Sequence, residues 1–227
     1  MKQYLMAACV AALATSAAAN DPRKLGVQNV GGSGSTEVVA QIWVDNWFEL
    51  HVNGQTIAQD SVAYKTERSF NAEQITFKAD LPMTVAIELR DYMENATGLE
   101  YIGSRKQQMG DGGAIMQFLS GGKVLGVSSS GWKCHVAQQA PVNASCEKAS
   151  NPQEGVGDCA ANDDVPSGDW TSASFDDGSW PPAVEHSASA VGPKDGYSEI
   201  NWSGAAKIIW SEDLERDNIV LCRATIG

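Results

Sequence analysis

Val44-Asp45-Asn46-Trp47-Phe48-Glu49-Leu50-His51-Val52-Asn53-Gly54 has the pattern of a two-faced β-strand that runs into a tight turn. Side chains alternate across a strand, so this stretch presents two different faces. The face expected in a core carries Phe48, Leu50 and Val52, and the opposite face carries Trp47, Glu49 and His51. Asn53-Gly54 suits the positive φ angles of a type I′ turn, so the next strand is expected to begin at Gln55.

A two-residue alternation of apolar and polar side chains recurs along the chain, as expected for half-buried strands. It is clearest at residues 83–90, where Met83, Val85, Ile87 and Leu89 are expected to face a core. We expect further strands at residues 36–44, 71–78, 114–119, 123–127, 131–136, 205–210 and 218–226. Many short strands between turn signals predict an all-β fold, a β-sandwich or jelly roll with long loops, in one domain over residues 36–227.

Residues 1–19 have the layout of a secretory signal peptide. Lys2 supplies a positive start, an apolar run follows from Leu5 to Leu13, and Ala17-Ala18-Ala19 is a small-residue cleavage signal. The apolar run is shorter than the roughly 20 residues that span a bilayer, so no membrane span is expected. Residues 20–35 lack an apolar period and are interpreted as a flexible leader. The protein is therefore expected to be secreted or periplasmic.

The formal net charge of −12 at pH 7 makes nucleic acid a poor partner, because a nucleic-acid-binding protein neutralises phosphates with basic side chains. An acidic surface accounts either for solubility or for affinity for cations.

Four of the five cysteines lie outside the signal sequence and predict two disulfides, as in many exported chains. Four cysteines allow three pairings. We favour Cys146 with Cys159, which closes a loop rich in turn residues, and Cys134 with Cys222, which joins two predicted strands. A zinc site is the alternative, but the sequence contains no Cys-x-x-Cys pair.

Long polar stretches at residues 91–113, 137–169 and 187–203 are expected to be loops, and loops of this length often carry function. The first is flanked or occupied by the carboxylates of Glu88, Asp91, Glu94 and Glu100. Oxygen ligands from loops suit calcium, which makes calcium a candidate cofactor. A solvated acidic loop is the alternative, since no spaced EF-hand pattern occurs.

Several short motifs follow one another in a recognisable order. They are Asp45-Asn46 leading into Leu50–Gly54, Gly131-Trp132, Trp170 with Phe175–Trp180, and Trp210-Ser211 before Arg223. This order resembles that of galactose-binding-like β-jelly-roll domains, which are accessory modules of α-rhamnosidases and β-galactosidases. The resemblance implies a jelly-roll fold, often with a structural calcium ion, and frequently carbohydrate binding without catalysis. The extra cysteines and the 137–169 stretch depart from the family pattern.

Aromatic rings beside carboxylates and amides suit a sugar, whose C–H face stacks on a ring while its hydroxyls form hydrogen bonds. The candidate ligand-binding residues are Trp47, Trp132, Asp195, Tyr197 and Trp202. Trp202 stands out because it lies in a predicted loop. The alternative is that tryptophans of a sandwich belong to its core.

The three histidines, His51, His135 and His186, each lie in or beside a predicted strand. If the fold brought them to one face, they would form a copper or zinc site, since neutral imidazole is a common ligand of both metals. The alternative is that they are scattered, hydrogen-bonded groups.

No nucleophile elbow, P-loop or metalloprotease signature occurs, so catalysis is not expected. The leading hypothesis is a secreted, non-catalytic protein that binds a carbohydrate or glycan. The alternative is an extracellular or periplasmic protein that binds copper or zinc through the three histidines.

Overall fold

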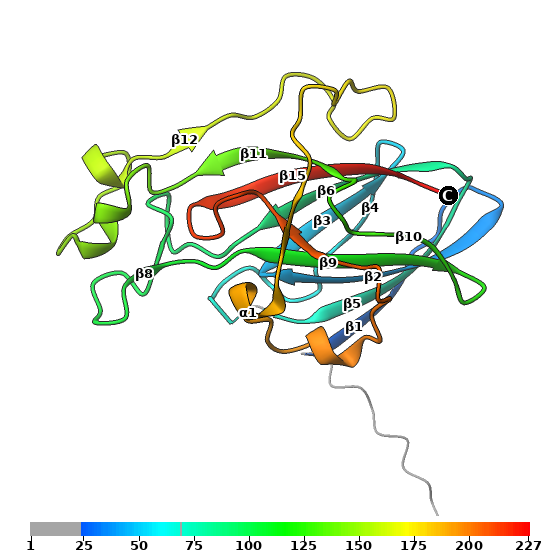
Figure 1. Cartoon of the computed structure of the whole chain (residues 1–227), viewed down its shortest axis with the longest axis horizontal. Helices are drawn as coiled ribbons and strands as arrows, with labels where there is room; N and C mark the ends of the chain where they lie inside the picture. Colours follow the sequence, from blue (N-terminus) through cyan, green and yellow to red (C-terminus); the bar gives the residue numbers. More distant parts are fainter. Residues whose placement is uncertain (1–23, 69) are drawn as a thin grey trace, which may run out of the picture.

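The structure, a computed structural model, describes residues 24–68 and 70–227. This part of the chain consists mainly of strands in two sheets whose inner faces share a hydrophobic core, the arrangement of a β-sandwich (Figure 1). The predicted all-β fold is confirmed. The predicted signal peptide lies outside the described residues.

Within the described residues, the first sheet has seven strands in the order β1-β5-β2-β9-β14-β13, with β10 also paired to β9. Its strands are β1 (Leu25–Asn29), β2 (Thr36–Asp45), β5 (Ala72–Ala79), β9 (Gly113–Ser120), β10 (Lys123–Val127), β13 (Val184–His186) and β14 (Ile208–Trp210). All neighbours are antiparallel except β1 and β5.

The second sheet, again counting described residues only, has six strands in the order β12-β11-β15-β6-β3-β4. Its strands are β3 (Trp47–Val52), β4 (Gln55–Gln59), β6 (Met83–Arg90), β11 (Lys133–Gln139), β12 (Asn162–Asp163) and β15 (Asp217–Ile226). A separate ribbon pairs β7 (Leu99–Glu100) with β8 (Gln108–Met109). Short helical segments are η1 (Ala144–Lys148), η2 (Gly157–Cys159), α1 (Ala188–Val191) and η3 (Tyr197–Glu199).

The chain changes sheets within the Val44–Gly54 stretch. Strand β2 ends in the first sheet at Asp45, and β3 begins in the second sheet at Trp47. The expected hairpin is confirmed, because Asn53 and Gly54 have φ angles of 50° and 83° and β4 begins at Gln55.

The core lies between the two sheets and is made by the predicted inward faces. Phe48, Leu50 and Val52 of β3 are buried there, as are the alternate apolar residues of β6. Full burial of such a side chain contributes roughly 1.5–3 kcal/mol, so these faces fix the register of both strands.

A second apolar cluster covers the outer face of the first sheet. Trp43 and Ile115 project from this face and pack against Val191 and Ile200 of the 187–203 stretch. This stretch includes α1 and η3, which lie beneath the sheet in Figure 1. The predicted loop is therefore a packed cover for the sheet.

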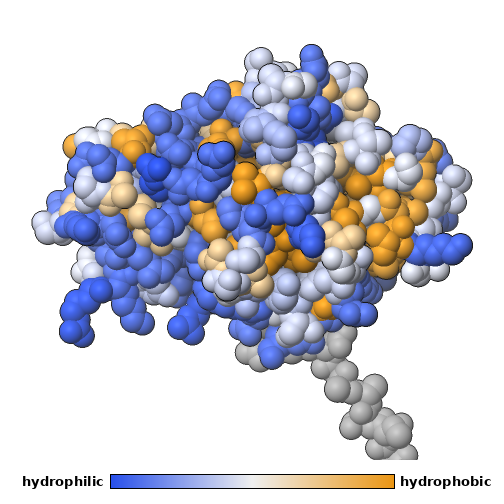
Figure 2. Space-filling model, viewed as in Figure 1, coloured by the Kyte–Doolittle hydropathy of each residue, from blue (hydrophilic) through white to orange (hydrophobic). Residues whose placement is uncertain are grey.

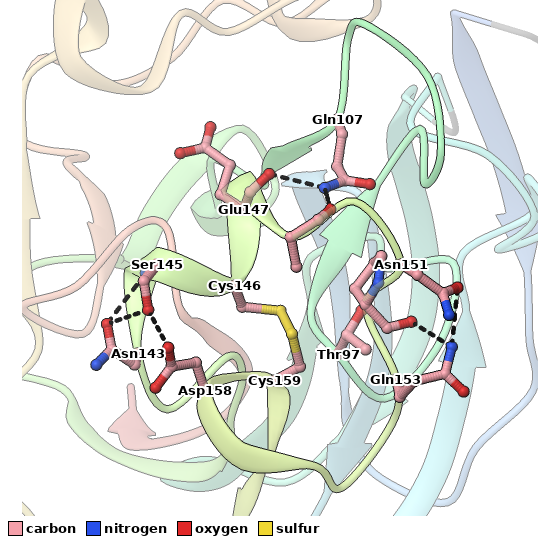
Figure 3. The surroundings of a disulfide bond; sticks show 12 residues. Thr97, Gln107, Asn143, Ser145, Cys146, Glu147, Asn151, Gln153, Asp158 and Cys159 are labelled. Carbon is pink, nitrogen blue, oxygen red and sulfur yellow. Dashed lines mark hydrogen bonds between the residues drawn. A yellow bond between two sulfur atoms is a disulfide. The ribbon is translucent and has the colours of Figure 1, made fainter.

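Both predicted disulfides are confirmed. Cys134–Cys222 joins β11 to β15 at directly opposed positions, and Cys146–Cys159 joins η1 to η2. Around the second bond, Gln107 Nε2 donates to the carbonyls of Glu147 and Ala149 at 2.7 and 2.9 Å, as Figure 3 shows in part. The 91–112 loop is thus attached to the disulfide-bonded segment.

The structure differs from the predicted leader at residues 20–35. Leu25–Asn29 form β1, which pairs in parallel with β5, although an apolar alternation is absent from their sequence. Backbone pairing at a sheet edge requires no such alternation, which explains the difference.

No helix among the described residues is long and apolar enough to cross a membrane. Figure 2 shows hydrophilic residues over the end of the sandwich near β8, and apolar residues gathered over β9 and β10.

Candidate metal centre

Three aspartates from distant parts of the sequence meet at one end of the sandwich. Asp45 is the last residue of β2, Asp91 directly follows β6, and Asp111 lies just before β9. One carboxylate oxygen of each residue lies within 4.8 Å of the corresponding oxygens of the other two. We call these three residues the aspartate cluster.

Strand pairing explains why these positions coincide. Asp45 of β2 pairs with Gly113, the first residue of β9. Asp111 lies shortly before Gly113 in the chain, and it is therefore placed beside the end of β2. The end of β6 is held at the same place because the amide of Asn46 donates to the carbonyl of Arg90 at 2.7 Å. The change of sheet after Asp45 therefore brings three strand ends together.

Glycines allow the loop before β9 to approach the cluster closely. A Cβ atom on Gly110 would overlap the carboxylate of Asp91, and one on Gly112 would overlap the ring of Trp210. Trp210 is fixed in turn, since its indole N–H donates to the carbonyl of Asp217 at 2.9 Å. Asp111 is thus held between two glycines that each pack against a fixed neighbour.

The inner two carboxylates of the cluster, those of Asp45 and Asp91, are buried and include oxygen atoms without hydrogen-bond partners. Asp45 and Asp91 are each 1% exposed. Oδ2 of Asp45 and both carboxylate oxygens of Asp91 have no hydrogen-bond partner among the described residues. Burying a carboxylate without a partner is costly, and a bound cation removes that cost.

The cluster has the electrostatics of a cation site. Burial, reinforced by repulsion from neighbouring carboxylates, raises the pKa values of Asp45 and Asp91 well above their usual range. Burial also raises the pKa of Asp111, and it raises the pKa of nearby Glu100 to about 7. A bound divalent cation would favour the ionised form of each group and reverse these shifts.

Lys194 supplies a positive charge at the edge of the cluster. Its Nζ lies 3.6 Å from Oδ2 of Asp111 and 4.8 Å from the ring centroid of Phe70. This ammonium group lowers the pKa values of Asp45 and Asp111, against the larger effect of burial. Lys194 therefore competes with any cation for Asp111.

We expect Lys194→Met to raise the affinity of the cluster for a divalent cation about threefold to fivefold, the range of a partly exposed ion pair. Calorimetric titration would measure this affinity. The matched control is Lys24→Met, because Lys24 lines the same cleft as Lys194 and makes no ion pair with Asp111. Equal increases in both variants would contradict a specific role for Lys194 and indicate a general effect of charge.

Asp111 lines one open cleft of about 580 Å³, and its ion-pair partner Lys194 lines a second open cleft of about 580 Å³. The aspartate cleft is lined by residues that include Asp111, His186, Ala190, Glu212, Leu214 and Glu215. The lysine cleft is lined by residues that include Lys24, Glu67, Phe70, Tyr101, Lys194 and Asp195. The ion pair between Asp111 and Lys194 connects the two clefts, and of the three aspartates Asp111 lines the aspartate cleft.

The five predicted carbohydrate-binding residues do not form one group. Trp132 is 2% exposed, stacks on Phe118 in the core and donates its indole N–H to the carbonyl of Val127. It is therefore a core residue, which corrects the prediction. Trp47 lies elsewhere, half-buried on β3, with the guanidinium of Arg90 5.3 Å from its ring centroid.

The other three predicted residues do share one segment. Trp202 and Tyr197 are partly buried against the apolar cluster beneath the first sheet, with their ring centroids 5.9 Å apart. The indole N–H of Trp202 donates to the carbonyl of Tyr197. Asp195 is exposed and lines the lysine cleft, while its carbonyl accepts the indole N–H of Trp43.

The three histidines lie in three separate environments. Nε2 of His51 lies 3.0 Å from Oε1 of Glu49, His135 donates to the carbonyl of Asp164, and His186 donates to the carbonyl of Ser211. The strands of His51 and His135 are separated by β6 and β15, and His186 lies in the other sheet. Among residues 24–68 and 70–227, the aspartate cluster is the one group of three such side chains within ligand distance. The expected three-histidine metal site is not formed.

Sequence reasoning named Asp91 and Glu100 as candidate calcium ligands but missed Asp45 and Asp111. A usable signal was present, because Asp45 and Asp91 directly follow predicted strands and Asp111 lies shortly before another. What was missing was knowledge of which strand ends meet.

Asp60, a buried carboxyl group outside the cluster, makes the stability of the folded protein depend on pH. Burial raises the pKa of Asp60 to about 8 from an ordinary value of 3.8. The folded protein therefore holds this proton more tightly than the unfolded chain, and its stability falls as the pH rises from about 4 to about 8.

We expect Asp60→Asn to leave stability unchanged near pH 4 and to raise it near pH 9 by on the order of 2 kcal/mol, because the buried charge is removed. The amide of Val62 would keep its acceptor, which lies at 2.8 Å. Urea unfolding across this pH range would measure the effect. A stabilisation that is equal at both pH values would contradict this assignment.

Comparisons with known proteins place the chain in no family. No family model matches the sequence, and neither a curated protein nor a solved structure matches it at the significance required. The resemblance to galactose-binding-like domains therefore stays a prediction.

Proposed function

We propose that this protein is an exported, non-catalytic binding protein that holds a hard divalent cation, above all calcium, with Asp45, Asp91 and Asp111. One observation carries the proposal: the three carboxylates converge within 4.8 Å, and the inner two keep buried oxygen atoms without hydrogen-bond partners. The two disulfides support an oxidising compartment for this protein.

The donor set favours calcium over copper or zinc. Carboxylate oxygens are hard ligands, whereas copper and zinc sites usually include imidazole or thiolate groups. Calcium binds oxygen at roughly 2.3–2.6 Å, so two ligands on opposite sides of the ion lie about 5 Å apart. The mutual distances within the cluster fit this limit.

Calorimetry on purified protein would test the proposal. The protein would be treated with a chelator, desalted and titrated separately with calcium, magnesium and zinc chloride. We expect one calcium ion per chain, weaker binding of magnesium and no stoichiometric zinc binding. The absence of calcium binding would refute the proposal. Zinc binding at one ion per chain would mean that the site holds a softer metal than calcium.

Carbohydrate binding is the second candidate function, and the lysine cleft favours it. This cleft combines the rings of Phe70 and Tyr101 with the charged side chains of Lys24 and Asp195, and its size suits a small ligand. Binding to a printed saccharide array, repeated with Asp195→Ala, would test it. Binding that chelation leaves intact and that this substitution weakens would support a sugar site in the lysine cleft, and no binding to any saccharide would contradict it.

A further inference from the structure

The aspartate cluster is buried on one side and open on the other. Asp45 and Asp91 are each 1% exposed, whereas the side chain of Asp111 is 44% exposed. Asp111 also lines the aspartate cleft, and Gly110, which packs against the Asp91 carboxylate, lines the same cleft. A cation in the cluster would therefore be approached from the aspartate cleft.

The number of ligands leaves room for a second molecule. Calcium takes about six to eight oxygen ligands, and the cluster offers three carboxylate groups. Among the described residues, no other carboxylate, imidazole or thiolate completes a group with these three. The remaining positions, on the side of the cleft, would be filled by water or by oxygen atoms of a ligand.

The charges around the cleft decide which kind of ligand fits. Asp213 is neutralised by Arg216, whose Nε and Nη2 lie 2.7 and 2.6 Å from its Oδ2. Glu212 and Glu215 are exposed acidic residues at the same cleft, so an anionic ligand would be repelled. Neutral hydroxyl groups avoid this repulsion, because they coordinate calcium through oxygen and donate hydrogen bonds to carboxylates.

The cleft also offers apolar surface and sufficient size. Leu214 and Ala190 line it beside the acidic residues, where they can contact the C–H groups of a sugar ring. Its volume of about 580 Å³ lies within the usual range of small-molecule sites, roughly 300–1,000 Å³.

We propose that the aspartate cleft binds a neutral saccharide whose hydroxyl groups coordinate the cation held by Asp45, Asp91 and Asp111. This inference rests on the proposed calcium site, and it names the class of ligand that this site recognises. It differs from the second candidate function, because sugar binding in the aspartate cleft requires the cation.

The first experiment tests the dependence on calcium. Calcium-saturated protein would be titrated with D-mannose, D-galactose, L-fucose and D-glucuronate, applied to a printed array of neutral and acidic oligosaccharides, and measured again after chelation. We expect binding of at least one neutral saccharide, a loss of at least tenfold in its affinity on chelation, and weaker binding of D-glucuronate. Sugar binding that survives chelation, or a preference for glucuronate, would overturn the inference.

The second experiment tests the location. Ala190 and Ala188 are exposed residues of α1, and only Ala190 is among the residues that line the aspartate cleft. Ala190→Trp is expected to lower saccharide affinity at least tenfold and to leave calcium affinity unchanged, while Ala188→Trp alters neither. Unchanged saccharide binding in Ala190→Trp would overturn the assignment to this cleft.

The two proposals fail in different ways. If the protein binds calcium but no saccharide on the array, the saccharide inference fails and the cation site stands. If calcium does not bind, both fail, and the calorimetric titration alone reveals this.

Discussion

Asp91→Asn is expected to lower calcium affinity at least about 100-fold and to make the cation-free protein more stable. Both effects have one cause. Both carboxylate oxygens of Asp91 are buried, lack hydrogen-bond partners and lie among like charges, so the negative charge is unfavourable without a cation and favourable with one. The substitution removes that charge at nearly constant volume.

Thermal unfolding with and without calcium would measure both consequences. At a calcium concentration 100-fold above the dissociation constant, binding stabilises the original protein by roughly 2.7 kcal/mol. Asp91→Asn should lose this stabilisation while starting from a higher melting temperature in chelator.

The control is Asp60→Asn, which alters another buried carboxyl group with a partnerless oxygen outside the cluster. This variant should keep its response to calcium. An Asp91→Asn protein that keeps the full calcium response would show that the cation, if bound, lies elsewhere.

The strands and disulfides were predictable because their signals are local. Alternation fixed the boundaries of β6, where the predicted and observed strands both run from residue 83 to residue 90. The Asn53-Gly54 turn was equally predictable, because its positive φ angles restrict the residue types that can occupy it. The pairing of Cys134 with Cys222 followed from the expectation that both lie in strands.

The cation site was not predictable in the same way. Asp45, Asp91 and Asp111 are brought together by the order of strands in two sheets, which alternation does not specify. Trp132 illustrates the same limit. It was expected in a strand over residues 131–136 and as a ligand-binding residue, but it lies directly before β11 and its ring stacks on Phe118 inside the sandwich. The sequence did not show which face would carry this ring, because tertiary packing decides that.

Removal of the Cys134–Cys222 disulfide is expected to cost about 4.5 kcal/mol of unfolding free energy, and removal of Cys146–Cys159 about 3 kcal/mol, from the loop entropy released in the unfolded chain. The difference follows from sequence separations of 88 and 13 residues. Paired cysteine-to-alanine variants, unfolded in urea, would measure both values.

The effects of the two disulfides on the cation site should be in the opposite order. Cys146 and Cys159 pack against Leu99, the neighbour of Glu100, and Gln107 attaches the same loop to η1. That loop ends at Asp111, so loss of Cys146–Cys159 should weaken calcium binding severalfold. Cys134–Cys222 joins two strands that contribute no ligand, and its loss should leave calcium affinity nearly unchanged as long as the protein is folded. The expected difference in calcium affinity between the two variants arises only from the local attachment of the 91–112 loop. Equal losses of affinity would therefore mean that the site depends on global stability alone.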